Sequence, residues 1–333
     1  MKIAINGFGR IGRNVFKIAW ERPGIEIVAI NDVADPETLA HLLKFDSTYG
    51  VYIRKIRVRD GYLVVDDQEV KVLAEKKPTE LPWGVLGIDV VIESTGVFRS
   101  AEGENGGYKD HIAAGAKKVI LSVDAEDDID QTIVLGVNDE MLDQNCTAFS
   151  NAGCTTNCLA PMVKILHDSI GIEQGLMTTI HAYTNDQVLL DRPHQDLRRA
   201  RSAATNILPT QTGASSAIER VIPELAGRLN GMAMRVPSIT GSVVDLVVKL
   251  SRSVEKDELN TAMKEAADGP MKGILEYTEA PIVSSDVRGN SHSVIFDAQA
   301  TMVLEHGLVK VIGWYDNEFA YSTRVVDLAQ KLG

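Results

Sequence analysis

The sequence predicts a two-domain α/β protein. Its N-terminal domain is of the Rossmann type, and its C-terminal domain is an α+β fold built on a mostly antiparallel sheet. Residues 2–31 read as strand, helix and strand, which implies parallel pairing through a right-handed crossover. After residue 154, long strand patterns are followed by helices without strict alternation, as in α+β domains. The 333 residues are enough for two domains, each with its own core.

The first domain is expected to cover residues 1–153. Residues 2–6 alternate like a strand, apolar residues from 11 to 19 follow helical spacing, and residues 25–30 form a continuous apolar strand. A polar alternating stretch over 53–75 contains Asp60-Gly61, a hairpin turn signal, so we expect an antiparallel ribbon on the sheet's edge. Strands over 89–93, 118–122, 131–137 and 147–149 complete the parallel run.

The second domain is expected to cover residues 154–316. A helix over 156–170 contains Pro161, so either the helix is kinked or Pro161 lies in its first turn. Strand patterns follow over 175–183, 231–237, 241–250, 292–304 and 308–315. A helix over 255–267 begins with acidic residues, as the helix dipole favours. A C-terminal helix over 317–333 is expected to join the first domain.

Composition excludes several classes of protein. The formal net charge is −12, which argues against a nucleic-acid surface. No apolar run approaches the roughly 20 residues of a membrane span, and the N-terminus enters a strand pattern without a signal peptide. Three cysteines cannot form a disulfide framework without a remainder, which indicates reduced thiols and a cytoplasmic location. We expect no metal site.

The N-terminus carries a dinucleotide-binding fingerprint. Gly7, Gly9 and Gly12 follow a strand and open a helix, and Asp32 ends the next strand. Gly7 allows a tight turn, Gly9 lets the backbone approach a pyrophosphate, and Gly12 permits close packing of helix and strand. Asp32 would accept hydrogen bonds from a ribose and repel a 2′-phosphate, which favours NAD over NADP. The alternative is a glycine-rich turn without a ligand.

Cys154 is the candidate nucleophile. It lies among small polar residues at an expected strand-to-helix junction, where a helix N-terminus would lower the pKa of its thiol. Cys158 is one helical turn further on, facing the core, and Cys146 has no comparable context. A partner base is needed, and sequence spacing alone does not choose between His181 and His194.

An arginine cluster at residues 198, 199 and 201 stands out in an acidic chain. The cluster either holds an anionic substrate or forms salt bridges with Asp186, Asp191 or Asp196. The turn over residues 210–213 offers hydroxyls and backbone N–H groups to an oxyanion, and Arg235 ends a strand.

Together these segments resemble the phosphorylating glyceraldehyde-3-phosphate dehydrogenase family over nearly the full length. The matching motifs include AINGFGRIGR, NAGCTTNCLAP, TTIHAYTNDQ, DLRRARSAATNILPT, TGSVVDL and WYDNEFAYSTRVVDL, in the family's order. The resemblance implies oxidation of glyceraldehyde 3-phosphate with NAD and inorganic phosphate, and a homotetramer. The alternative within this group is a related sugar-phosphate dehydrogenase acting on erythrose 4-phosphate.

The resemblance also implies roles for individual residues. Cys154 would attack the aldehyde, and His181 would act as the base. The residues implied to bind substrate and attacking phosphate are Gly153, Thr155, Thr184, Arg199, Thr212, Gly213 and Arg235. Besides the three fingerprint glycines, the residues implied to contact NAD are Arg10, Ile11, Asp32, Lys76, Thr95, Gly96, Ser122 and Asn317.

Three positions depart from the family pattern. Gly153 replaces the usual Ser before the nucleophile, which removes a hydroxyl donor worth about 1 kcal/mol. Arg192-Pro193 replaces a Leu-Pro pair, and an arginine there could meet a 2′-phosphate, although Asp32 argues the other way. Phe319-Ala320 replaces Trp-Gly, which we interpret as a change of packing near the nicotinamide.

Overall fold

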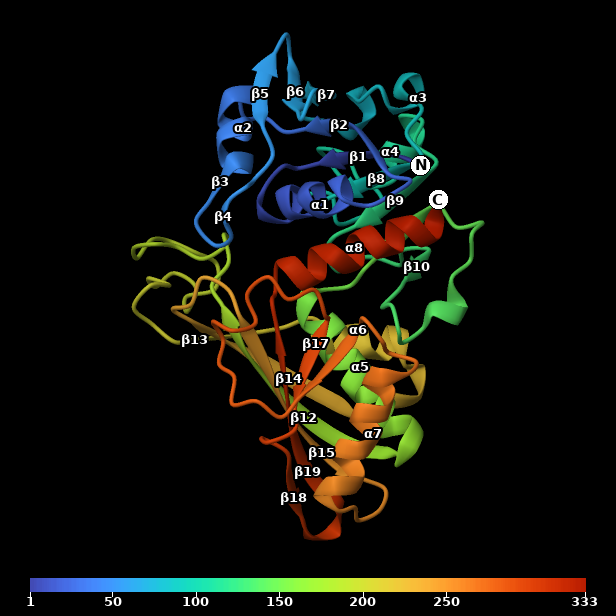
Figure 1. Cartoon of the computed structure of the whole chain (residues 1–333), viewed down its shortest axis with the longest axis vertical. Coiled ribbons are helices and arrows are strands. Elements are labelled where there is room, and N and C mark those ends of the chain that lie inside the picture. The colour runs from blue at the N-terminus through green and yellow to red at the C-terminus, as the bar shows by residue number, and fades with distance from the viewer. The chain divides into compact units, whose positions relative to one another are not determined.

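The structure is a computed structural model that describes all residues 1–333 (Figure 1). The chain divides into two units, each with its own sheet. The first unit comprises residues 1–133, 140–152 and 322–333, and the second comprises residues 134–139 and 153–321.

The first unit is built on a sheet in the order β10-β11-β9-β8-β1-β2-β7-β6-β5. Its parallel strands are β1 (Lys2–Asn6), β2 (Glu26–Asn31), β7 (Gln68–Leu73), β8 (Val90–Glu93), β9 (Lys118–Leu121), β10 (Gln131–Thr132) and β11 (Ala148–Ser150). Two antiparallel strands, β5 (Ile56–Arg59) and β6 (Tyr62–Val65), extend the edge beyond β7. The parallel run and its antiparallel ribbon are therefore as predicted.

The helices of this unit follow the crossover pattern of a doubly wound sheet. They are α1 (Arg10–Trp20), α2 (Pro36–Lys44), α3 (Trp83–Leu86), α4 (Asp110–Ala113) and most of α8 (Phe319–Leu332), beside a short pair of strands, β3 (Phe45–Asp46) and β4 (Gly50–Val51). Asp35 caps α2 by accepting from the N–H of Thr38, which satisfies one of the unpaired first-turn donors.

Two sequence predictions about local structure need correction. The strand expected over 131–137 ends at Thr132, because the chain turns on itself there. Val134 N–H donates to Asn138 Oδ1, and Gly136 has a φ of +84°. In α5 (Cys154–Ser169), Pro161 lies in the interior of the helix, so of the two alternatives given for Pro161 its placement in the first turn is wrong.

The second unit is built on a sheet in the order β13-β14-β12-β15-β19-β17-β16, with β18 paired to β19. Its strands are β12 (Ile172–Ala182), β13 (Leu208–Thr210), β14 (Leu229–Val236), β15 (Ser242–Leu250), β16 (Leu275–Thr278), β17 (Val294–Asp297), β18 (Met302–Leu304) and β19 (Leu308–Tyr315). Only β12 with β14 and β16 with β17 pair in parallel, so the predicted mostly antiparallel sheet is confirmed.

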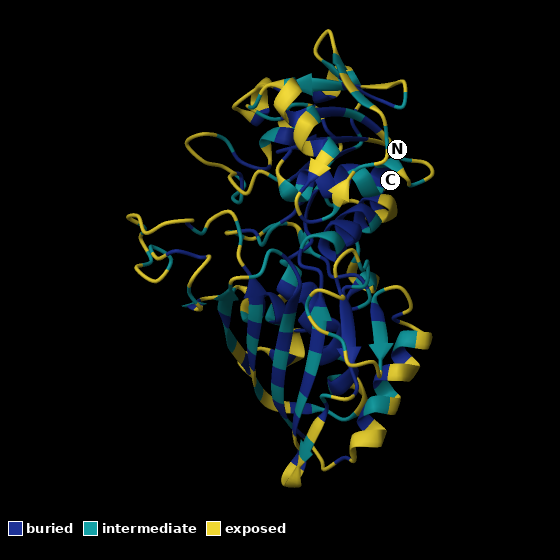
Figure 2. Ribbon diagram, turned by 60° about the vertical axis from the view of Figure 1, so that its left-hand side comes forward, coloured by how far each residue is buried: buried dark blue, intermediate teal, exposed yellow.

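Helix α5 packs on this sheet, together with α6 (Ala214–Val221) and α7 (Lys256–Asp268). Burial alternates with a period of two along β15, and Figure 2 shows alternating dark blue and teal bands on strands of this sheet. This alternation is that of a sheet covered on one face. None of the helices combines the length and apolar character that a membrane crossing requires.

Candidate active site

The glycine loop joins β1 to α1 in the first unit. Gly7 has a φ of +89°, and a Cβ there would lie 2.6 Å from the backbone nitrogen of Thr95. A Cβ on Gly12 would lie 2.1 Å from the carbonyl oxygen of Gly7. Gly9, in contrast, faces open space, because no atom lies within 4 Å of a Cβ built on it. Two glycines therefore serve the packing of the loop, and Gly9 leaves room for a phosphate at the start of α1.

Asp32 follows β2 and links the loop to the next strand. Its Oδ2 accepts from the N–H of Phe8 at 2.8 Å, and its Oδ1 accepts from the N–H of Ala34 at 3.0 Å. Each carboxylate oxygen has a second lone pair, so Asp32 keeps acceptor capacity for ribose hydroxyls. The acceptor oxygens of Asp32 and the open face of Gly9 fit a dinucleotide with an unphosphorylated 2′-hydroxyl.

The other residues expected to contact the cofactor gather at the carboxyl ends of neighbouring strands of the same unit. Lys76 follows β7, Thr95 and Gly96 follow β8, and Ser122 follows β9. Ligands of open α/β sheets bind at this edge.

Arg10 and Ile11 begin α1, but the Arg10 side chain is engaged elsewhere. Its Nη1 donates to Asp46 Oδ1 at 2.8 Å. The backbone of Arg10 and Ile11, rather than the arginine side chain, is thus what this loop presents. Asn317 belongs to the second unit.

Cys154 begins α5 and faces His181 from β12. Its Sγ lies 3.3 Å from His181 Nε2. The dipole of α5 favours a thiolate at this position. Ala152, two residues earlier, has a φ of +52°, a left-handed conformation that costs a non-glycine residue about 1 kcal/mol or more. The chain thus turns sharply just before the sulfur.

His181 is buried beside a permanent cation. Burial and the neighbouring charge of Arg235 lower the pKa of His181 to about 3. The strand register explains the contact, because His181 pairs with Arg235 across β12 and β14. The imidazole is therefore neutral at physiological pH while Arg235 lies against it.

Arg235 also selects the tautomer of that imidazole. Its Nη1 contacts His181 Nδ1 and lies 3.3 Å from the carbonyl oxygen of Ala182. Guanidinium only donates, so Nδ1 accepts and the imidazole proton is on Nε2, facing Cys154. Ala182 O also lies 2.7 Å from Nδ1, so it can accept an Nδ1 proton once Arg235 moves away. Nε2 then becomes the proton acceptor.

A buried tyrosine ties the two reacting groups together. Tyr315 Oη lies 2.9 Å from Thr155 Oγ1 and 2.9 Å from Thr179 Oγ1. Its ring meets that of His181 edge to face, with centroids 5.9 Å apart. Thr155 follows Cys154 and Thr179 lies two residues before His181, so Tyr315 fixes the first turn of α5 against β12.

The arginine cluster is engaged in salt bridges. Arg199 donates to Asp186 Oδ2 at 2.7 Å and to Thr210 Oγ1 at 2.9 Å, and Arg201 donates to Asp191 at 2.8 Å. Thr184 Oγ1 donates to the same Asp186. The salt-bridge alternative is thus realised, and the Asp186 carboxylate lies where Arg199 and Thr184 would meet an anion.

The remaining anion-site candidates come from two helix starts in the second unit. Gly153 caps α5 without a side-chain hydrogen bond, and Gly213 caps α6. Thr212 Oγ1 accepts weakly from the N–H of Ala214 at 3.3 Å.

His194 lines a separate pocket with Arg198 and Arg199, so the structure pairs Cys154 with His181.

Two contributors to this unit, Tyr315 and Ser242, were missed in the sequence, whereas Asp186 was expected as a salt-bridge partner of the arginine cluster. Ser242 Oγ donates to Asn317 Oδ1 at 2.9 Å and accepts from the N–H of Ala182 at 3.1 Å. This contact leaves the Asn317 amide nitrogen as the group offered to a ligand. Tyr315 is the last residue of β19 and Ser242 is the first residue of β15, so the available signal was a hydroxyl residue at the boundary of an apolar strand pattern. No group of three or more His, Cys, Asp or Glu side chains is placed to hold a metal ion.

Comparison with protein families assigns both halves of the chain. Residues 1–101 match the model "Glyceraldehyde 3-phosphate dehydrogenase, NAD binding domain", and residues 153–317 match "Glyceraldehyde 3-phosphate dehydrogenase, C-terminal domain". A glyceraldehyde-3-phosphate dehydrogenase of Borreliella burgdorferi is 66% identical, covering 100% of this chain and 99% of the relative. Those of Geobacillus stearothermophilus and Bacillus subtilis are 54% and 53% identical, each covering 99% of this chain and 97% of the relative.

Proposed function

The chain belongs to the glyceraldehyde-3-phosphate dehydrogenase family, and we propose that its Cys154 and His181 carry the chemistry of that reaction. The protein is an NAD-dependent oxidoreductase that converts glyceraldehyde 3-phosphate and inorganic phosphate to 1,3-bisphosphoglycerate in glycolysis. The names of its relatives do not support the erythrose 4-phosphate alternative. The single observation behind the proposed roles is the 3.3 Å contact between Cys154 Sγ and His181 Nε2.

The first step forms a carbon–sulfur bond. Once Arg235 moves away, the imidazole proton lies on Nδ1 and is donated to Ala182 O, so that Cys154 passes its proton to His181 Nε2 and the thiolate attacks the aldehyde carbon. The carbonyl oxygen becomes an oxyanion, which takes the proton back from the imidazolium to give a thiohemiacetal.

The second step is the oxidation. NAD, when bound, supplies the acceptor for the hydride that leaves the thiohemiacetal carbon. His181 Nε2 takes the hydroxyl proton as the carbonyl re-forms, so that a thioester remains on Cys154. We propose that Gly9, Asp32 and the strand ends at Lys76, Thr95 and Ser122 hold the cofactor, and that Asn317 binds its carboxamide.

The third step resolves the thioester. An oxygen of inorganic phosphate attacks the carbonyl carbon, the carbon–sulfur bond breaks, and Cys154 leaves as thiolate. We assign substrate and attacking phosphate to two groups of donors in the second unit, which comprise Gly153, Thr155, Thr184, Arg199, Thr212, Gly213 and Arg235. Positioning of the two anions reduces the entropic cost of the step.

Rapid mixing tests the two catalytic roles. The native enzyme should release a burst of NADH with aldehyde and NAD, and steady turnover should require phosphate. Cys154→Ser should abolish the burst, and His181→Asn should slow it by about 10²–10⁴-fold. Cys146→Ser is the matched control, because its thiol contacts neither group, and it should keep the native burst. A normal burst in Cys154→Ser would exclude the covalent route.

The homotetramer expected from the resemblance also belongs to this proposal. Leu189, Leu190 and Leu197 are each more than three-quarters exposed on the segment between β12 and β13. Large apolar side chains exposed to this degree on one segment are typical of protein interfaces, and we assign a second copy of this chain as the partner. Analytical ultracentrifugation should give about four times the 36.2 kDa chain mass, and Leu190→Asp should lower it. Sedimentation of the native protein as a single chain would contradict the assignment.

The enzyme is also proposed to work in the cytoplasm. All three cysteines are free thiols, which suits a reducing compartment. Cell fractionation should recover the protein in the cytoplasmic fraction, and recovery elsewhere would exclude this location.

A further inference from the structure

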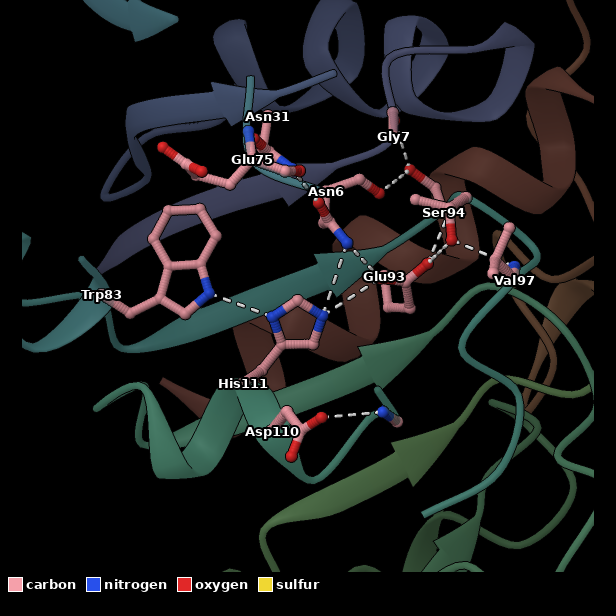
Figure 3. Close-up of polar contacts among 12 residues, drawn as sticks. Asn6, Gly7, Asn31, Glu75, Trp83, Glu93, Ser94, Val97, Asp110 and His111 are labelled. Carbon is pink, nitrogen blue, oxygen red and sulfur yellow. Dashed lines mark hydrogen bonds and ion pairs between the residues drawn. The ribbon is translucent and has the colours of Figure 1, made fainter. Parts of the chain in front are cut away.

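A row of buried polar side chains crosses the sheet of the first unit beneath the expected cofactor edge (Figure 3). Glu93, Asn6 and Asn31 end the adjacent strands β8, β1 and β2, and they are paired in register. Their exposed fractions are 1%, 1% and 5%. His111, which is fully buried, adjoins Glu93. The reaction as described above uses none of the four.

One end of the row is fixed by Trp83. Its Nε1 lies 3.0 Å from His111 Nδ1, and an indole nitrogen only donates. His111 Nδ1 must therefore accept, which makes the imidazole neutral with its proton on Nε2. That proton is donated to Glu93 Oε2 at 3.1 Å.

The other end is fixed by the backbone of Glu75. The Glu75 N–H donates to Asn31 Oδ1 at 2.9 Å, and its carbonyl accepts from Asn31 Nδ2 at 2.9 Å. These two bonds set the orientation of the Asn31 amide, which donates to Asn6 Oδ1 at 2.7 Å. The Asn6 amide is set in turn, and its Nδ2 donates to Glu93 Oε2.

Both fixed ends thus direct a donor at the same carboxylate oxygen. The other oxygen, Oε1, accepts from the backbone N–H of Thr95 at 2.8 Å and from the Thr95 hydroxyl. The Thr95 hydroxyl then accepts from the N–H of Val97 at 3.0 Å. Glu93 therefore receives four hydrogen bonds, all from neutral donors. If the Glu93 carboxyl were protonated, its O–H would point at one of these N–H or O–H donors. Glu93 is therefore buried as an anion.

We propose that ionised Glu93 is the positioning residue of the cofactor site. On one side it holds the turn of Thr95 and Gly96, and on the other it holds, through Asn6 and Asn31, the strand ends that carry Asp32 and Lys76. One buried charge therefore sets the distance between the turn of Thr95 and Gly96 and the strand ends that carry Asp32 and Lys76. The inference rests on the proposed function, because it takes these residues as the ones that bind NAD.

Glu93→Gln tests the charge. The amide nitrogen of glutamine must face either the Thr95 donors or the two donors at Oε2, and no flip of His111 or Asn31 relieves the conflict without breaking a fixed bond. The dissociation constant of NAD, measured by isothermal titration calorimetry, should rise about tenfold or more. At saturating NAD, kcat and the KM for the aldehyde should stay within about twofold of the native values.

Two substitutions of His111 separate positioning from packing. His111→Gln places an amide N–H where Nε2 was, which keeps the donor to Glu93 and loses the acceptor for Trp83. His111→Asn does the reverse. We expect native NAD affinity within about twofold for His111→Gln and about tenfold weaker binding for His111→Asn. If Glu93→Gln does not fold, the comparison of His111→Gln with His111→Asn still tests whether the hydrogen bond to Glu93 sets the NAD affinity.

Tyr108→Phe is the matched control. It deletes one hydrogen bond of a fully buried side chain, from Tyr108 Oη to Asp127 at 3.0 Å, without touching the row. It should lower Tm and leave NAD affinity unchanged. Native affinity in Glu93→Gln, equal weakening in both His111 variants, or weakening in Tyr108→Phe would each overturn the proposal. Failure of the native enzyme to bind NAD would instead refute the proposed function.

Discussion

Replacing Arg235 by Met should make Cys154 more reactive in the absence of substrate. Arg235 contacts the imidazole of His181, and burial together with this charge lowers the pKa of that imidazole from 6.5 to about 3. Removing the cation leaves burial, the larger cause, in place. The imidazole should therefore recover part of its proton affinity, and its Nδ1 should be free to donate to Ala182 O.

The size of the effect follows from the contact. Two unit charges about 4 Å apart interact by roughly 4 kcal/mol at an effective dielectric constant of about 20, equivalent to about 3 pKa units. Burial is the larger cause of the lowered pKa, so we take about half of this Coulomb energy, ~2 kcal/mol, as the part that removing Arg235 returns. Transfer of the Cys154 proton to His181 then becomes about 30-fold more favourable, because each unit is a factor of ten in that equilibrium.

The assay is alkylation by iodoacetamide, a neutral reagent, with Cys154 followed by peptide mass spectrometry so that Cys146 and Cys158 are counted apart. The rate constant at pH 6–7 should rise by about 10- to 30-fold in Arg235→Met. Arg201→Met is the control, since Arg201 pairs with Asp191 and neither residue is among the groups that shift the pKa of His181, and it should react at the native rate. A pH profile of Arg235→Met that superimposes on the native one would refute the reasoning.

Four further substitutions have outcomes set by the structure. Gly9→Ala should fold with native Tm, since its Cβ meets open space, but it should weaken NAD binding by at least about tenfold. Gly7→Ala should instead lower the free energy of unfolding by more than about 2 kcal/mol, because its Cβ would lie 2.6 Å from Thr95 N. Urea titration and calorimetry distinguish them, and equal behaviour of the pair would contradict the division of roles. Gly153→Ser should add a capping hydroxyl to α5, raise the free energy of unfolding by a few tenths of a kcal/mol, and lower the KM for phosphate, whereas an unchanged KM would show that no phosphate meets that hydroxyl. For Asp46, burial raises the pKa, but hydrogen bonds and the charges of Arg10 and Lys17 outweigh burial and lower the pKa from 3.8 to about 2. The stabilisation that ionised Asp46 provides is therefore present above pH 3.8 and lost as pH falls towards 2. Asp46→Asn should accordingly lower the free energy of unfolding by about 1–3 kcal/mol at pH 7 and by much less at pH 2. Denaturant titrations at the two pH values would disprove this role of Asp46 if native protein and Asp46→Asn differed as much in free energy of unfolding at pH 2 as at pH 7.

The cofactor loop was predictable because its constraints are local. Gly7, Gly9, Gly12 and Asp32 lie within one strand–helix–strand unit, and the spacing alone fixes which backbone must be approached closely. The buried row beneath it was not predicted, because Glu93 and Asn6 meet only through the pairing of β8 with β1. A weaker signal was present, since both residues are polar and end apolar strands. Such a residue must be hydrogen-bonded, but the sequence does not name its partner.

The choice between the two candidate histidines shows what strand register adds to sequence. His181 and Thr179 have the same parity on β12 and are both buried, so period-two alternation places them on one face. Thr179 bonds Tyr315, which bonds Thr155 beside Cys154, and that face must therefore point at the start of α5. His194 lies outside any strand, so no register constrains its direction. A histidine that shares parity with a buried hydroxyl residue on a strand beside a helix start is thus a better candidate than one of equal spacing in a loop.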